Sequence, residues 1–227
     1  MSYIGHLDVM RYFQKVIRRA GIPIAFSSGF SPHMIMSFAS PLGLGVTSQG
    51  EYFDIEITQE IPSKEAVARM NATSVEGIEV LSFRRIPSEK KSSGMTILAG
   101  ASYLVTFGES DCGALRRESI EDVLNGFLAQ SEINILKETK RSKKMVDIKP
   151  FIYELKVRGD MEVEMTLAAG SKENLKPNLV MEALCMAVGM EYLEYSYQYH
   201  RLEMFANVGE EGNISLVSLE SLGEEIV

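Results

Sequence analysis

Apolar and polar positions in the first part of the chain follow the spacing of two helices and several short strands. Apolar residues recur at helical spacing over residues 7–20, and Gly21 and Pro23 predict the end of that helix. A second helix is expected from Ser63, a natural N-cap. The solvent-facing side of the first helix carries Arg11, Lys15, Arg18 and Arg19. Short strands are expected over residues 22–26, 34–39, 51–57 and 78–86.

The second part of the chain follows a polar segment, residues 87–94, that is typical of a linker. One helix is expected over residues 120–128, and another begins at Pro177 and ends near residue 186. Strands are expected over residues 102–107, 132–138, 151–158, 162–167 and 195–205.

These elements indicate an α+β fold made of two ferredoxin-like units. The second unit, residues 95–206, has the order β-α-β-β-α-β in full. The first unit, residues 1–88, has the same order without its N-terminal strand, so either a segment upstream of Met1 supplies that strand or the unit lacks it. Residues 207–227 are rich in glutamate, and we expect them to form a loosely held acidic tail.

Composition limits the class of protein. The chain has 227 residues, 45% of them hydrophobic, and a net charge of −8. No apolar run approaches the roughly 20 residues of a membrane helix, and the N-terminus lacks the pattern of a signal peptide, so we expect a cytoplasmic protein with no membrane contact. Cys112 and Cys185 are far apart and predict neither a disulfide framework nor a zinc cluster. The negative charge argues against general adhesion to nucleic acid but leaves room for a local basic patch.

The densest group of chemically versatile side chains lies near the N-terminus. It contains His6, Asp8 and Arg11, followed by a turn that places His33 after Gly29, Phe30, Ser31 and Pro32. Two imidazoles and a carboxylate can bind a phosphate, carry out acid–base chemistry or hold a metal. Alternatively, His6 and Asp8 cap the first helix and His33 bonds to a loop carbonyl.

A second group is basic. Five cations and one anion fall within a short segment between two expected strands, namely Lys140, Arg141, Lys143, Lys144, Asp147 and Lys149. In an otherwise acidic chain, such a segment suits a flexible clamp for phosphates, although a solvated surface loop is the simpler alternative. Tyr192, Tyr195, Tyr197 and Tyr199 can stack bases or pack within a sheet.

Several segments resemble the radical SAM-linked proteins of bacteria. They include Tyr-Ile-Gly-His-Leu-Asp-Val-Met-Arg (3–11), Gly-Phe-Ser-Pro-His (29–33), Gly-Glu-Tyr-Phe-Asp-Ile-Glu (50–56) and Asp-Ile-Lys-Pro (147–150). The resemblance implies a companion of a radical SAM enzyme encoded nearby, with RNA as a candidate substrate. Family members usually begin with an extra strand, and many carry Pro-Lys where this chain has Met34 and Ile35.

Three hypotheses follow. The first is a non-catalytic accessory protein, without a cofactor of its own, that binds RNA through both groups and presents it to the radical SAM enzyme. The second is an independent, metal-free RNA-processing or RNA-modifying enzyme that uses His6 and His33. The third is a purely structural interaction module, and an open sheet edge in the first unit can also support a homodimer. Duplicated ferredoxin-like units also occur in RAMP-type CRISPR RNA-processing proteins, an analogy at the level of fold.

Overall fold

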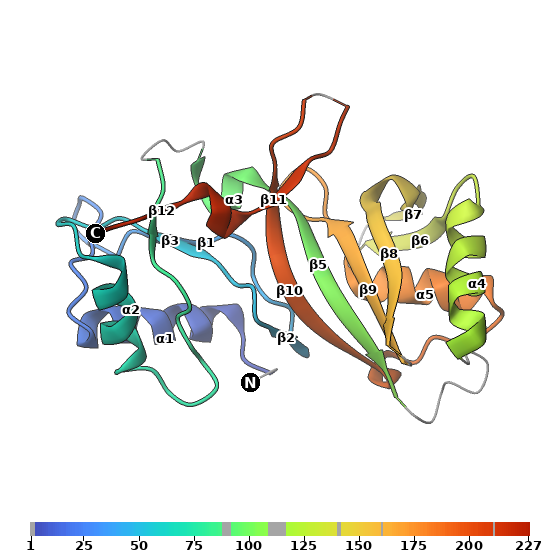
Figure 1. Cartoon of the computed structure of the whole chain (residues 1–227), viewed down its shortest axis with the longest axis horizontal. Helices are drawn as coiled ribbons and strands as arrows, with labels where there is room; N and C mark the ends of the chain where they lie inside the picture. The colour runs from blue at the N-terminus through green and yellow to red at the C-terminus, as the bar shows by residue number, and fades with distance from the viewer. Residues whose placement is uncertain (1–2, 88–91, 109–116, 140–141, 160, 211) are drawn as a thin grey trace. The chain divides into compact units, whose positions relative to one another are not determined.

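A computed structural model describes residues 3–87, 92–108, 117–139, 142–159, 161–210 and 212–227, and Figure 1 labels its helices and strands. The chain divides into two units that are interleaved in sequence. Unit 1 contains Met1–Leu44, Glu51–Leu98 and Met204–Val227, and unit 2 contains residues 45–50 and 99–203. The fold is α+β with mixed sheets, because β2 (Val46–Ser48) pairs in parallel with β10 (Tyr197–Asn207) and the other registered strand pairs are antiparallel.

Unit 1 is built around two helices, α1 (His6–Arg19) and α2 (Ser63–Asn71). Its antiparallel pairs are β1 (Met36–Phe38) with β3 (Phe53–Ile55), and β4 (Arg84–Arg85) with β12 (Glu224–Glu225). It also contains the short helix α3 (Gly94–Ile97), the strand β11 (Leu216–Ser218) and the 3₁₀ helix η4 (Leu219–Leu222). Its core contains Val16, Ile17, Ala20, Ile22, Ile24, Met34, Ile61, Ala66 and Met70.

The end of α1 follows directly from Gly21. This glycine has a φ of +64°, which favours glycine because it has no Cβ. Its N–H donates to the Arg18 carbonyl at 3.3 Å, and the N–H of Ile22 donates to the Ile17 carbonyl at 3.1 Å. These two bonds form a Schellman motif, which satisfies carbonyls that the helix end would otherwise leave open. The expected end of this helix is therefore confirmed.

Unit 2 is centred on a sheet in the order β10-β5-β9-β8, to which β2 adds along β10. The strands are β5 (Leu98–Phe107), β8 (Ile152–Gly159) and β9 (Glu162–Ala168) together with β10. The helix α4 (Arg117–Ala129) contacts β8 and the second helix, α5 (Pro177–Ala187). A separate hairpin is formed by β6 (Asn134–Thr139) and β7 (Ser142–Asp147). Two 3₁₀ helices complete the unit, η2 (Lys149–Phe151) and η3 (Glu194–Ser196).

Three local expectations differ from the structure. Residues 22–26 form only the isolated bridges Ile24–Ile57 and Phe26–Met34, since Pro23 has no N–H for a continuous ladder. In the expected strand 78–86 only β4 forms, because the Asn71 side chain bonds both backbone groups of Val80 at 2.8 Å in place of a partner strand. The basic segment is not a loop throughout: residues 142–147 are β7.

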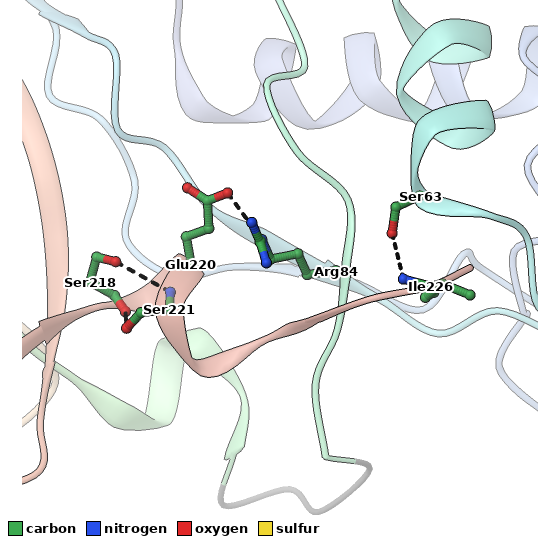
Figure 2. Close-up of polar contacts among 6 residues, drawn as sticks. All are labelled: Ser63, Arg84, Ser218, Glu220, Ser221 and Ile226. Carbon is green, nitrogen blue, oxygen red and sulfur yellow. Dashed lines mark hydrogen bonds and ion pairs between the residues drawn. The ribbon is translucent and has the colours of Figure 1, made fainter.

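The C-terminal segment packs on unit 1 and is not the loosely held tail that its composition suggests. Figure 2 shows its polar anchors. The N–H of Ile226 donates to Ser63 Oγ at 2.8 Å, and the N–H of Ser63 donates to the Ile226 carbonyl at 2.9 Å. Glu220 pairs with Arg84 at 3.0 Å, while Leu219 and Ile226 are buried. The ion pair of Glu220 neutralises one arginine, and the buried side chains of Leu219 and Ile226 supply the burial that a loose tail would lack.

Candidate nucleic-acid interface

His6 lies in the first turn of α1, and its ring packs edge-on against Phe38 with the ring centroids 5.2 Å apart. Asp8 forms an exposed ion pair with Arg11, at 3.6 Å between Oδ1 and Nη1. The N-cap of α1 is Gly5, and no side chain caps it. The alternative in which His6 and Asp8 cap the helix is therefore wrong, since both residues lie within the helix and neither side chain bonds its N-cap. The His6 ring instead packs against Phe38, and the Asp8 carboxylate pairs with Arg11.

His33 closes a loop. The ring Nδ1 of His33 lies 2.8 Å from Ser27 Oγ, and the backbone N–H of His33 donates to the same oxygen at 3.1 Å. The backbone carbonyl of His33 accepts from the backbone N–H of Ser27 at 2.9 Å. Gly29 has a φ of +110°, a backbone conformation that disfavours any side chain. The loop presents Phe30 fully to solvent, at 112% relative exposure. Within the motif Gly-Phe-Ser-Pro-His, the imidazole thus fixes the base of the loop and the phenyl ring is its exposed element.

The two imidazoles have different neighbours. His6 contacts Phe38 at the end of β1, whereas His33 precedes Phe38 by five residues of largely extended chain, about 16 Å. Their hydrogen bonds and ring contacts are not shared. Within the described ranges, no three His, Cys, Asp or Glu side chains are grouped so that they could hold a metal ion. The geometry of unit 1 gives no support to joint acid–base catalysis by this pair.

The basic group lies on the β6–β7 hairpin. Lys143 and Lys144 are exposed on β7, and Lys144 is in register with Lys137 on β6. The registered pair Leu136 and Met145 is also exposed, at 53% and 57%. Lys140 and Arg141 lie outside the described residues.

The base of the hairpin is held by two of the residues that the sequence assigned to phosphate binding. Asp147 Oδ1 accepts from the N–H groups of Ile133 at 2.8 Å and Lys149 at 3.0 Å. Lys149 Nζ donates to the carbonyl of Gln130, directly after α4. These bonds fix the position of the hairpin relative to α4. Asp147 and Lys149 therefore have structural roles at the base of the hairpin. The side chains of Lys143 and Lys144 are exposed.

The tyrosines of the last strand region form a packed cluster. Tyr192 stacks on Tyr197 at 5.3 Å and bonds Tyr199 through the two hydroxyls at 3.1 Å. Tyr197 also lies 3.0 Å from Cys185 Sγ. Burial raises the pKa of Tyr199 and of Cys185, which keeps both groups protonated. Tyr192, Tyr197 and Tyr199 therefore pack against one another, as in the second of the two alternatives for these residues. Of the four tyrosines, only Tyr195 is largely exposed, at 83%.

Two other cations of unit 2, Lys156 and Arg158, pair with acidic side chains. Glu164 is buried, a condition that by itself disfavours its charge, yet its bonds to Arg158 and Lys156 lower its pKa overall. Both cations thus pair with Glu164 on the neighbouring strand, and Lys156 also pairs with Glu154 at 2.9 Å. Cations with acidic partners are poor anchors for an external anion.

Sequence reasoning missed the third histidine. His200 Nδ1 lies 2.8 Å from Thr47 Oγ1, and its Nε2 lies 3.4 Å from Gln49 Oε1. The contact exists because β2 pairs with β10 in register, His200 opposite Thr47. A separation of 153 residues along the chain leaves no local signal for such a pair. These contacts attach residues 46–49 to unit 2.

Comparisons with known proteins add the following. None of the described helices has the length and apolar composition required to span a membrane. No curated protein matches the sequence. A chain in the crystal structure of a Cbf5-Nop10-Gar1 complex is similar at a TM-score of 0.46 and 12% identity, over 90% of this chain and 46% of that one, so this chain spans about half of its length.

A family model described as "Uncharacterized protein conserved in bacteria (DUF2344)" matches residues 1–177. The matched residues include α1, the loop that carries Phe30 and the β6–β7 hairpin, and they end at the first residue of α5. The chain therefore belongs to this bacterial family.

Proposed function

We propose that the protein is a non-catalytic accessory factor that binds a structured RNA through the β6–β7 hairpin and presents it to a radical SAM enzyme. The radical SAM partner rests on the resemblance of the sequence segments alone. The chain has two cysteines, fewer than the three that hold a radical SAM iron–sulfur cluster. In this proposal the cluster and the chemistry belong to the partner, and this chain supplies RNA binding.

One observation carries the proposal: exposed lysines are concentrated on a hairpin whose base is fixed, in a chain of net charge −8. Asp147 and Lys149 hold that base through bonds to backbone groups, and three isoleucines in or next to the hairpin are buried, namely Ile133, Ile135 and Ile148. An anchored strand pair presents its ammonium groups with less loss of conformational freedom than a free loop. Phosphate contacts of this kind position RNA without reading its sequence.

The proposed architecture is a pair of ferredoxin-like units. For unit 2 it is supported by the series β5-α4-β8-β9-α5-β10 and by the strand order β10-β5-β9-β8, with the β6–β7 hairpin inserted after α4. For unit 1 it is supported by the series α1-β1-β3-α2, in which two antiparallel strands lie between two helices along the chain. The insertion would then place the cationic hairpin on an otherwise regular scaffold, which is where functional loops commonly occur.

The test is RNA binding by the full-length protein. Total bacterial RNA serves for retention, and a fluorescent stem–loop RNA serves for titration between 50 and 200 mM salt. Replacing Lys143 and Lys144 by alanine should weaken binding and lower the slope of log K against log salt by about 0.7–0.9 for each lost phosphate contact. The matched control replaces Lys172 and Lys176, two exposed lysines of the same unit. Equal affinity of both variants would overturn the assignment of the hairpin.

A further inference from the structure

The solvent face of α1 is a second cationic surface, in unit 1. Successive residues of a helix are about 100° apart, so Arg11, Lys15, Arg18 and Arg19 fall within a sector of about 100° and along about 12 Å of the axis. All four side chains are exposed. Val16, Ile17 and Ala20, on the other side of the helix, are buried in the core. The orientation of the cations is therefore fixed by the packing of the opposite face.

Most of these cations lack acidic partners, which distinguishes them from the other arginines of unit 1. Arg69, Arg84 and Arg85 pair with Glu65, Glu220 and Glu60, respectively. Within the part of the chain that the structure describes, no carboxylate pairs with Lys15, Arg18 or Arg19. Neighbouring like charges at spacings of three and four residues destabilise a helix slightly. An external polyanion would relieve this repulsion.

The chemistry of the stripe favours a phosphate backbone. Guanidinium groups bind phosphate oxygens through two parallel hydrogen bonds, and three of the four cations are arginines. A row about 12 Å long faces more than one phosphate of a strand. A membrane surface fits less well, since amphipathic helices bind bilayers by inserting their apolar face, and that face of α1 is buried in the core.

We propose that this face of α1 is a second RNA-binding surface, which contacts the phosphate backbone without reading bases. The inference rests on the proposed function and extends it from the hairpin of unit 2 to a helix of unit 1. It also gives a role to Arg11, whose partner Asp8 is an exposed carboxylate 3.6 Å away that a phosphate can replace.

The experiment compares two alanine variants of the full chain. One replaces Lys15, Arg18 and Arg19, and its control replaces the exposed lysines Lys64, Lys172 and Lys176, with the same change in net charge. With the fluorescent stem–loop RNA as probe, the α1 variant should bind about tenfold more weakly or worse, and its salt slope should fall by about 2–3. The control should keep both values. Circular dichroism and thermal melts establish that the α1 variant is folded.

The outcomes separate this inference from the proposed function. If the hairpin variant loses affinity while the α1 variant binds like the wild type, the role of α1 is overturned and the proposed function stands. If the α1 variant alone loses affinity, the second surface is supported and the hairpin assignment fails. Absence of RNA binding by the wild type overturns both. The stripe would be assigned to a membrane, and the inference overturned, by two results together. Vesicles containing phosphatidylserine would retain the wild type but not the α1 variant, and the two proteins would bind RNA with equal affinity.

Discussion

Gly50 lies so close to the backbone of β10 that it leaves no space for a side chain. A Cβ at this position would overlap the Leu202 carbonyl oxygen and lie 2.7 Å from the Glu203 Cα. Backbone atoms within a sheet cannot move aside without breaking strand pairs. We therefore expect Gly50→Ala to destabilise the protein by about 1–3 kcal/mol, as measured by urea unfolding.

Gly126 provides the matched control, because it lies within α4 and an added Cβ would meet no atom within 4 Å. Gly126→Ala should raise the free energy of unfolding by about 0.5–1 kcal/mol, since alanine is the better helix former. A Gly50→Ala protein as stable as the wild type would contradict the close approach of residues 45–50 to β10.

Asp54 makes the stability of the folded protein depend on pH. Burial raises its pKa above the ordinary value of 3.8, and the hydrogen bond from the Gly94 N–H, at 2.8 Å, opposes this only in part. The folded state thus favours the neutral carboxyl. The resulting stabilisation is complete below the unfolded pKa and is lost as pH rises through the raised folded pKa.

Asp54→Asn should therefore gain stability relative to the wild type as pH rises from about 3.5 toward 7, because the amide stays neutral and can still accept from Gly94. Asp54→Ala, in contrast, leaves the buried N–H of Gly94 without its acceptor and should cost about 1–3 kcal/mol. Urea unfolding of the three proteins across this pH range measures both effects. A gain for asparagine that shrinks with rising pH would show that the charged form is the stabilised one.

Residue roles within the candidate interface were only partly accessible from the sequence. The excess of cations near residue 144 is visible in composition alone, and the exposure of Lys143 and Lys144 agrees with it. The roles of His33 and Asp147 could not be predicted from the sequence, because each depends on a hydrogen bond that forms only when the loop or the hairpin folds. The pattern Gly-Phe-Ser-Pro-His drew attention to the imidazole, whereas Phe30 is the exposed side chain.

Among the elements, the C-terminal segment depends on a pair of hydrogen bonds with Ser63 at the start of α2 (Figure 2). Ser63→Ala removes the acceptor for the buried N–H of Ile226, so we expect a loss of about 1–2 kcal/mol in unfolding free energy. Ser28→Ala, in an exposed loop, is the control and should change stability by less than about 0.5 kcal/mol. If the two variants are equally stable, this anchor contributes little to holding residues 216–226.

Elements with a strong local pattern were predictable and those that depend on distant partners were not. The α1 helix has both an apolar period and a terminating glycine, and it ends one residue from the expected position. By contrast, β7 consists mainly of polar residues, and its strand conformation comes from pairing with β6. The segment at residue 80 has the composition of a strand, but a side-chain amide occupies its backbone groups.

At the scale of the whole molecule, the two units exchange segments of chain. Residues 45–50 belong to unit 2 although the chain on both sides of them belongs to unit 1, and residues 204–227 return to unit 1. The sequence suggested a division near residue 90, because composition changes at the polar linker. Pairing between β2 and β10 joins residues about 150 positions apart, and neither composition nor periodicity encodes such long-range contacts.

This interleaving predicts an unusual pattern of native-state hydrogen exchange. Amides that open together belong to one cooperative unit, whatever their order along the chain. The N–H of Gln49 donates to the Arg201 carbonyl at 3.0 Å, so its protection should follow that of β5 and β9 as denaturant is added. The N–H of Glu56, which donates to Ile35 at 3.1 Å, should follow α1 and α2 instead.

The decisive comparison is thus between two amides only a few residues apart in sequence. Gly50→Ala supplies the control, because loosening β2 should speed exchange at Gln49 while leaving Glu56 close to its wild-type rate. If Gln49 and Glu56 instead share one opening free energy that also describes α1, the segment 45–50 opens with its sequence neighbours, and the division into interleaved units would not describe how this protein unfolds.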